Sequence, residues 1–223
     1  MAAIITEKFR QHNATQFFES FTEASASTYY LFVGKATAYT SGTTGGSDSS
    51  PPTPSDSPSD TEFYAWDSML AAKNVTSSDV TFSIPRRNWV NGTTYDMYDD
   101  NISSSNTATS GASNLYDSTF YFMTSDYRVY KVLDNNGNTN STVEPTGTST
   151  SILTTGDGYK WKYMYTLSAS QQANFLSTDF MAVATNSTVS SAAVDGAINI
   201  VKIKTAGSSG SEGTHASVPI RGT

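Results

Sequence analysis

The chain has 223 residues, a formal net charge of −7 and no cysteine. The excess of acidic residues excludes a broad basic surface for phosphate groups, so nucleic acid is not an expected partner. The absence of cysteine excludes a disulfide framework, a thiolate metal site and a thiol nucleophile.

Composition favours strands and turns over helices. Aromatic residues are abundant, with 13 Tyr and 11 Phe, while only 15% of the residues are charged. Ser, Thr and Asn fill much of the remainder and compete with the helix backbone for hydrogen bonds. No run reaches the roughly 20 apolar residues that cross a bilayer, and the apolar patch Ala2–Ile5 is too short for a signal peptide. We therefore expect a mainly β, soluble protein without a membrane partner, made in the cytoplasm.

The N-terminal third is expected to contain two helices and one strand. Phenylalanines recur on one helical face after Asn13, which predicts a helix over Ala14–Thr22. Tyr29–Val33 is a β-prone run that ends at a glycine. Ser41–Asp60, rich in Gly, Ser and Pro, is predicted to be an exposed insertion loop. Apolar spacing predicts a second helix over Thr61–Lys73.

The remaining elements are mostly strands. Alternating apolar residues predict a strand over Val80–Ile84. Thr119–Met123 and Arg128–Leu133 are expected to form a hairpin. A capping-box pattern predicts a helix over Ala169–Leu176, and Ile198–Ile203 is predicted to be the last strand.

The most regular pattern in the chain is an aromatic ladder over Tyr159–Leu167. It follows a Gly-Asp-Gly turn, and its aromatic residues alternate with lysines and other residues. Side chains in a strand alternate between two faces, so the ladder places its aromatic side chains on one face. Two interpretations follow: a central core strand, or an exposed face that binds sugars or partner proteins.

Candidate residues for catalysis or metal binding are few. His12 and His215 have no acidic or histidine partner at ligand spacing, so we interpret both as solvated or structural. Asp96, Asp99 and Asp100 form the densest acidic cluster, but it lacks the order of a calcium-binding loop, and solvated turn residues are the favoured interpretation. We therefore predict no catalytic, cofactor or metal site.

The sequence alone leaves open two classes of function, a carbohydrate-binding module and a glycosidase. A carbohydrate-binding or adhesin-type β module needs coplanar exposed aromatic side chains, for which Tyr95, Tyr98 and Tyr116 are the candidates. A β-fold glycosidase needs two carboxylates whose pairing depends on the tertiary fold, and no specific pair stands out.

Arg86 and Arg87 form an adjacent pair after a predicted strand. Neighbouring residues at a strand exit point to opposite sides, so one guanidinium can pair with a buried or interfacial carboxylate. The alternative interpretation is a solvated surface pair.

A set of short stretches, taken in order, resembles a known family. The stretches are Thr6–Arg10, Tyr30–Lys35, Ala38–Tyr39, Pro51–Ser57, Ile84–Trp89, Val129–Leu133, Val143–Pro145 and Gly156–Tyr163. They resemble the baseplate wedge subunit of contractile-tailed bacteriophages of the T-even kind, in the version carried by related marine phages. No single stretch is decisive, but the ordered set is specific.

The resemblance implies a structural protein of the virion tail baseplate, without enzymatic activity or cofactor. Family members are similar in having a layered β-sandwich with helix-bearing loops, in forming homodimers, and in binding neighbouring wedge proteins. Assembly interfaces are enriched in aromatic residues and arginine. The interface or structural candidates are Arg86, Arg87, Trp89, Tyr159, Trp161 and Tyr163.

One β-sandwich domain is expected over residues 1–205, with residues 41–60 as an exposed loop. Residues 206–223 form a Gly/Ser-rich C-terminal segment. Because members of the resembled family are longer, this segment is expected to be either a truncated or a divergent end.

Overall fold

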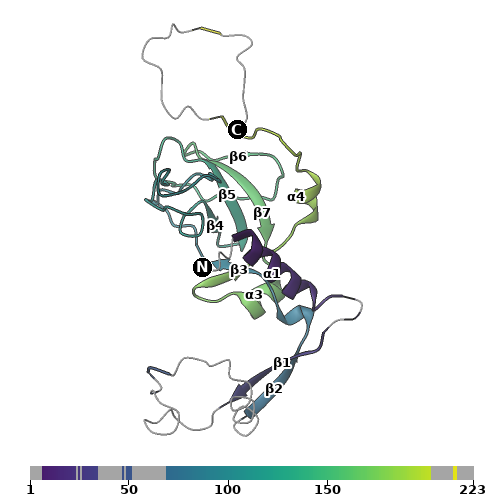
Figure 1. Cartoon of the computed structure of the whole chain (residues 1–223). Helices are drawn as coiled ribbons and strands as arrows, with labels where there is room; N and C mark the ends of the chain where they lie inside the picture. Colours follow the sequence, from purple (N-terminus) through teal and green to yellow (C-terminus); the bar gives the residue numbers. More distant parts are fainter. Residues whose placement is uncertain are drawn as a thin grey trace, which may run out of the picture. The chain divides into compact units, whose positions relative to one another are not determined.

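The computed structural model describes residues 7–23, 25, 27–34, 47, 49–51, 69–201 and 213–214. The chain divides into two compact units (Figure 1). Unit 1 comprises Met1–Ile84 with Ser168–Val183, and unit 2 comprises Pro85–Leu167 with Ala184–Thr223. Strands dominate and the helices are short, so the expected mainly β fold is confirmed. The single domain expected over residues 1–205 stays a prediction.

The described residues of unit 1 form two helices, a 3₁₀ turn and two separate two-stranded sheets, in which β1 pairs with β2 and β3 with β8. The bounds are Glu7–Glu19 for α1, Tyr29–Gly34 for β1, Met69–Val75 for β2, Ser77–Asp79 for η1, Ser83–Pro85 for β3, Ala169–Phe175 for α3 and Phe180–Ala182 for β8.

The end of the helix predicted over Thr61–Lys73 is wrong. Met69–Val75 forms strand β2, which runs antiparallel to β1 with Tyr29 opposite Val75. The prediction used an apolar spacing whose last two members, Met69 and Leu70, belong to this strand. Its first part, residues 61–68, lies outside the described residues, as do most of the predicted loop 41–60 and the expected C-terminal segment.

Helix α1 begins earlier than the sequence pattern indicates. It starts at Glu7, so Asn13 lies inside the helix and does not cap it. Phe18 in its last turn and Phe21, just after its end, contact other parts of unit 1. The ring of Phe21 lies 4.5 Å from that of Tyr29, and the ring of Phe18 lies 4.9 Å from that of Phe82.

The strand predicted over Val80–Ile84 is shorter and lies later in the chain. Only Ser83–Pro85 forms strand β3, because the preceding residues follow the turn η1. This turn is fixed by the carboxylate of Asp79, which accepts a hydrogen bond from the backbone amide of Thr76 at 3.0 Å. Asp79 also pairs with Lys73, and this bond, together with the hydrogen bonds from Thr76, lowers the pKa of its carboxyl to about 2. The predicted helix near residue 169 is confirmed as α3, with the expected capping box at Ser168.

Unit 2 is built on a four-stranded antiparallel sheet with strand order β4-β5-β7-β6 (Figure 1). The strands are Tyr121–Met123 (β4), Arg128–Asp134 (β5), Leu153–Thr154 (β6) and Lys160–Thr166 (β7). β4 and β5 confirm the predicted hairpin. One face of the sheet carries the core, which includes Phe122, Tyr130, Val132, Trp161 and Tyr163.

The aromatic ladder is strand β7, in the interior of this sheet. Its buried residues Trp161, Tyr163 and Tyr165 alternate with half-buried ones, as a period of two requires. The indole of Trp161 is fully buried and meets the ring of Phe122 edge-on, with 4.9 Å between the ring centroids. The interpretation of the ladder as a core strand is therefore confirmed.

The C-terminal part of unit 2 departs from the predictions. Residues 198–201 do not form a strand, and 202–203 lie outside the described residues. Val201 is mostly exposed. An alternation of apolar residues forms a strand only where a neighbouring strand supplies backbone hydrogen bonds and side-chain contacts. Helix α4, Ser187–Ser191, was not predicted, because its Ser- and Thr-rich sequence is a weak helix former. Among the helices that the structure describes, none has the length and apolarity that would cross a membrane.

Candidate functional site

The two units differ in where their apolar side chains lie. Among the described residues, unit 1 contributes only Met181 and Ala182 to the buried apolar set, and unit 2 contributes all the others. Unit 1 is nevertheless rich in phenylalanine and tyrosine. Its large apolar side chains therefore form surface rather than core.

A groove of about 520 Å³ lies in unit 1 among α1, α3, β8 and the segment around η1. It is lined mainly by aromatic side chains: Phe17, Phe18, Phe21, Phe82, Phe175 and Phe180. Phe17, Phe82 and Phe180 are each about half exposed. An apolar hollow of this kind is typical of sites that receive an apolar side chain or helix from a binding partner.

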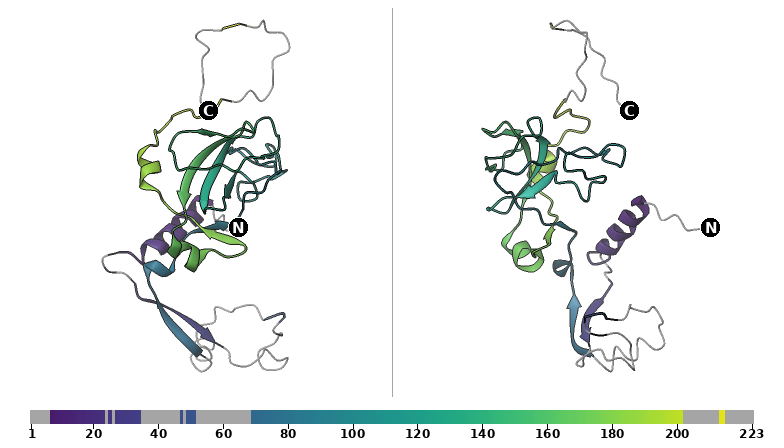
Figure 2. Two further views of the ribbon diagram at one scale, coloured as in Figure 1. Left: turned by 180° about the vertical axis from the view of Figure 1, so that it is seen from behind. Right: turned by 90° about the vertical axis from the view of Figure 1, so that its left-hand side faces the viewer.

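The β1–β2 hairpin, which we call the arm, is a two-stranded ribbon in unit 1 (Figure 2). Its exposed side chains form a second apolar surface in this unit. Nearly every residue of both strands is exposed, on both faces of the hairpin. At its base, Tyr29 contacts the rings of Phe17 and Phe21. Beyond that base, Lys73 pairs with Asp79 of η1, and no other described strand of unit 1 joins the arm.

In unit 2, polar groups tie long loops to the sheet, and Asp96 is central to one such network. Its carboxylate accepts hydrogen bonds from the amide and hydroxyl of Ser110, the hydroxyl of Ser118 and the amide of Thr119, at 2.6 to 2.9 Å. Burial acts to raise its pKa, but these hydrogen bonds outweigh burial and lower it below the usual value. Asp96 is 1% exposed, so its interpretation as a solvated turn residue is wrong.

Asp157, in the turn before β7, organises a second network. Its carboxylate accepts hydrogen bonds from the amides of Thr142 and Val143 at 2.8 and 3.0 Å, and from the hydroxyl of Thr155. These bonds also lower the pKa of the carboxyl against the opposing effect of burial. The Gly-Asp-Gly turn therefore ties residues 141–143 and Thr155 to the start of the aromatic strand.

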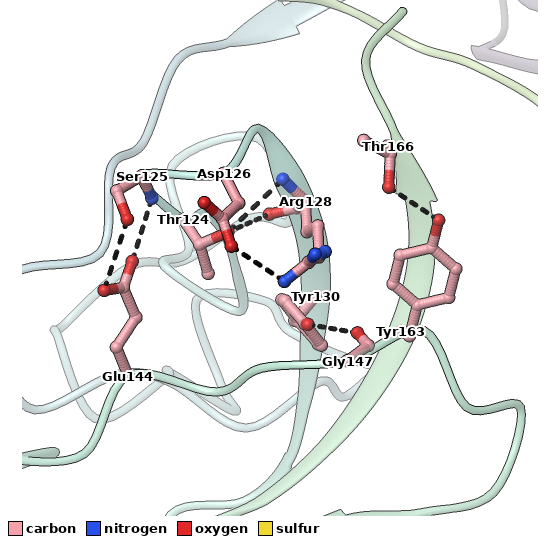
Figure 3. A network of polar contacts seen from close by, with 9 residues as sticks. All are labelled: Thr124, Ser125, Asp126, Arg128, Tyr130, Glu144, Gly147, Tyr163 and Thr166. Carbon is pink, nitrogen blue, oxygen red and sulfur yellow. Dashed lines mark hydrogen bonds and ion pairs between the residues drawn. The ribbon is translucent and has the colours of Figure 1, made fainter.

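A third network fixes the β4–β5 turn (Figure 3). The carboxylate of Glu144 accepts a hydrogen bond from the amide of Ser125 at 2.8 Å, and Arg128 pairs with Asp126 at 2.8 Å. Farther along the strand, the hydroxyl of Tyr130 donates to the carbonyl oxygen of Gly147. The loop that contains residues 144–147 is thus attached to the hairpin at two points.

The arginine pair occupies two different environments. Arg87 donates to the hydroxyl of Tyr121 and to the carbonyl oxygen of Tyr116, and its guanidinium lies 4.8 Å from the centroid of the Tyr121 ring. Arg86 donates from Nε to the side-chain oxygen of Asn88 at 3.1 Å. The described contacts of the Arg87 guanidinium are therefore with tyrosines instead of the carboxylate that the sequence suggested.

Trp89 and Arg86 lie together at a hollow of about 330 Å³ in unit 2, whose wall also includes Ser125, Tyr127 and Glu144. The indole nitrogen of Trp89 donates to the hydroxyl of Ser141 at 3.1 Å. The other three candidates, Tyr159, Trp161 and Tyr163, are buried in the core cluster. The structure thus brings Arg86 and Trp89 to one surface and buries the three ladder residues in the core.

The tyrosines considered for carbohydrate binding do not form an exposed platform. Tyr95 is 4% exposed and packs in the core cluster, so this candidate is wrong. Tyr116 is exposed, whereas the ring of Tyr98 is covered on one side by the Lys131 ammonium at 4.2 Å. Stacking on a sugar requires a free aromatic face, which these three residues do not supply together.

The residues described here hold no group of three His, Cys, Asp or Glu side chains that could bind a metal ion. His12 is exposed on α1, and His215 lies outside the described part of the chain.

Two phenylalanines of the unit 1 groove were not predicted as site residues from the sequence. Phe175 and Phe180 lie on either side of the α3–β8 turn and were not singled out, because isolated phenylalanines carry no periodic signal. The only signal for them is indirect: unit 1 contains many phenylalanines but has few buried positions to hold them, so some of these side chains must lie on the surface.

The chain matches the model of a protein family described as Phage-Gp8, Bacteriophage T4 Gp8, over residues 3–144. This region includes α1, the arm, β3, β4 and β5. A search of curated proteins finds no match.

Proposed function

Because this chain belongs to the Gp8 family of phage T4, a structural component of the baseplate wedge in the virion tail, we propose that it acts there through surfaces of unit 1. Membership of this family implies contacts with other baseplate proteins. The resemblance to the marine-phage version stays a prediction.

The distribution of apolar side chains carries this proposal. Unit 2 has a well-packed core, whereas unit 1 exposes a phenylalanine-lined groove and a hairpin with two apolar faces. A soluble monomer rarely exposes apolar patches of more than a few hundred Å², and larger ones mark interaction sites. Unit 2 then provides the stable body, and unit 1 provides the surfaces that neighbouring proteins cover.

Two kinds of partner are proposed: a second copy of the chain, giving a homodimer, and neighbouring wedge proteins. No role in nucleic-acid binding is proposed, because the net charge is −7. No catalytic role is proposed either. The polar networks around Asp96 and Asp157 have their hydrogen bonds directed to loop backbone and hydroxyl groups, which is a structural use of carboxylates.

Arg86 and Trp89 are proposed as a smaller contact site in unit 2. Arginine and tryptophan are the residue types that most often anchor protein interfaces, and both border one hollow. Arg87, Tyr159, Trp161 and Tyr163 are proposed as structural residues that support it.

Co-purification with the other wedge proteins of the same phage tests the groove. Phe180→Asp places a charge in the groove, and we expect at least a 10-fold loss of bound wedge proteins. Val194→Asp is the matched control, because Val194 is an exposed apolar residue of unit 2. Unchanged near-ultraviolet circular dichroism establishes that unit 2 is intact in both variants. Equal co-purification of wild type and Phe180→Asp would remove the groove from the proposal.

A further inference from the structure

The arm has an edge that lacks the usual protection against strand pairing. β1 contains neither a charged residue nor a proline, and its single irregularity lies between Val33 and Gly34. β2 contains one charged residue, Lys73, which already pairs with Asp79. Natural proteins normally block exposed edges with charges, prolines or bulges. Among the described residues, no strand pairs with the outer edge of β1, which is therefore open to pairing with another strand.

The two faces of the arm carry large apolar side chains. Leu31 and Val33 lie on one face, and Tyr30 and Phe32 lie on the other, because side chains alternate along a strand. These four residues and Leu70 of β2 are between 49% and 65% exposed. A two-stranded sheet is only marginally stable in water, and three or more strands are needed for independent stability. In the described part of unit 1, the arm therefore lacks the additional strands that would stabilise it.

We infer that the arm pairs with the arm of a second copy of the chain, with the two β1 strands antiparallel across a two-fold axis. The inference rests on the homodimer proposed above and assigns a surface to it. Antiparallel pairing of one strand with its own copy is self-complementary, as a closed dimer requires. The product is a four-stranded sheet in which no charge opposes another along the β1–β1 junction.

The available surface matches this assignment. Five large apolar side chains that are exposed to this extent present on the order of 500 Å² per copy. Edge pairing leaves most of this surface on the two faces of the joined sheet, and it brings the apolar side chains of the two β1 strands into cross-strand contact on both faces. Backbone hydrogen bonds between the two edges add the directional contribution that is typical of strand addition.

Charge-swapped variants of the full chain test the inference by light scattering and sedimentation. The wild type is expected to dimerise. Leu31→Lys places like charges near the two-fold axis, and so does Leu31→Glu, so each variant alone is expected to dimerise at least 10-fold more weakly. An equimolar mixture of the two is expected to regain dimers, because unlike charges then meet. Val194→Lys, in unit 2, is the control and should dimerise like the wild type.

The outcomes separate the inference from the proposal on which it rests. Normal dimerisation of both Leu31 variants would overturn the arm-to-arm contact and leave the homodimer standing. Failure of the mixture to recover, with each variant folded by circular dichroism, would also overturn it. A wild-type chain that stays monomeric at the highest soluble concentration would reject both, while binding of wedge proteins would still be decided by the co-purification experiment.

Discussion

At the scale of single residues, the buried aromatic side chains of unit 2 have the largest effect on stability. Trp161 lies fully buried on β7, and its ring contacts those of Tyr95, Phe122 and Tyr159. Its indole nitrogen donates to the hydroxyl of Thr155 at 2.9 Å, so the ring is packed among apolar neighbours and its N–H group has a hydrogen-bond partner. Removal of such a side chain leaves a cavity and an unpaired acceptor.

We expect Trp161→Ala to lower the free energy of unfolding by about 3–5 kcal/mol, as large aromatic truncations in cores do. Chemical denaturation followed by circular dichroism measures this loss. Val194→Ala, at an exposed position of the same unit, is expected to change stability by less than about 0.5 kcal/mol. A loss below about 1 kcal/mol for Trp161→Ala would contradict the core role of this residue.

Asp96 makes stability depend on pH. Its folded-state pKa is lowered, so its stabilisation is complete above the unfolded-state pKa of about 3.9 and is lost as pH falls through the folded value. Asp96→Asn leaves buried donors poorly paired, and we expect a loss of about 2–4 kcal/mol at pH 7.

Denaturation curves measured from pH 7 to pH 3 test this prediction. The wild type should lose more stability than Asp96→Asn over this range, because the variant has no carboxyl to protonate at that site. Asp100→Asn is the control, since Asp100 is exposed and its stability profile should follow the wild type. Parallel curves for wild type and Asp96→Asn would show that this carboxylate is not the source of acid sensitivity.

At the scale of elements, local patterns predicted the structure well where a strand has both a regular alternation and neighbours to pair with. β7 and the β4–β5 hairpin meet both conditions. β2 did not form the helix that was predicted from the spacing of four apolar residues, because pairing with β1 outweighs this weak local pattern. α4 carries no signal other than Asn186, whose side chain accepts from the amide of Val189.

The candidate surfaces were less predictable than the strands. Arg86 and Trp89 could be named from their residue types, but their meeting at one hollow depends on tertiary structure. The role of Asp96 depends on Ser110, Ser118 and Thr119, which are far from it in the sequence. An acidic cluster in a polar chain looks solvated until the loop that covers it is known.

The turn before β7 provides a test at this scale. Gly158 has φ of +84°, and a Cβ atom there would lie 2.6 Å from the side chain of Asn136. Gly158→Ala should therefore combine backbone strain with a clash and cost about 2–4 kcal/mol. Gly147→Ala is a matched control, because Gly147 has φ of +91° with open space around the added Cβ.

Thermal or chemical unfolding compares the two glycine variants. Gly147→Ala should cost about 1 kcal/mol from backbone strain alone. If both variants lost the same stability, the side chain of Asn136 would have moved aside without cost, and the packing of this turn would be looser than the structure indicates.

At the scale of the whole molecule, the two units are expected to differ in local stability. The free energy of local unfolding rises with the number of buried apolar contacts in a segment. These contacts are concentrated in unit 2. In dilute protein, the amides of β1 and β2 should therefore exchange with solvent at least 100-fold faster than those of β5 and β7.

Hydrogen exchange read by mass spectrometry measures this difference. Raising the protein concentration should slow exchange in the arm and leave β5 and β7 unchanged, because only the arm gains contacts on association. Equal protection of β1 and β7 in dilute protein would contradict the division of the chain into a stable body and an assembly surface.

The lack of charge on the β1 edge has a consequence for the conditions under which the protein associates. An interface without ion pairs at its centre is barely screened by dissolved salt. Association driven by apolar surface instead weakens on cooling, since its driving force near room temperature is mainly entropic and it buries surface with a negative heat-capacity change. Contacts made through the arm should therefore tolerate wide variation in ionic strength and loosen in the cold.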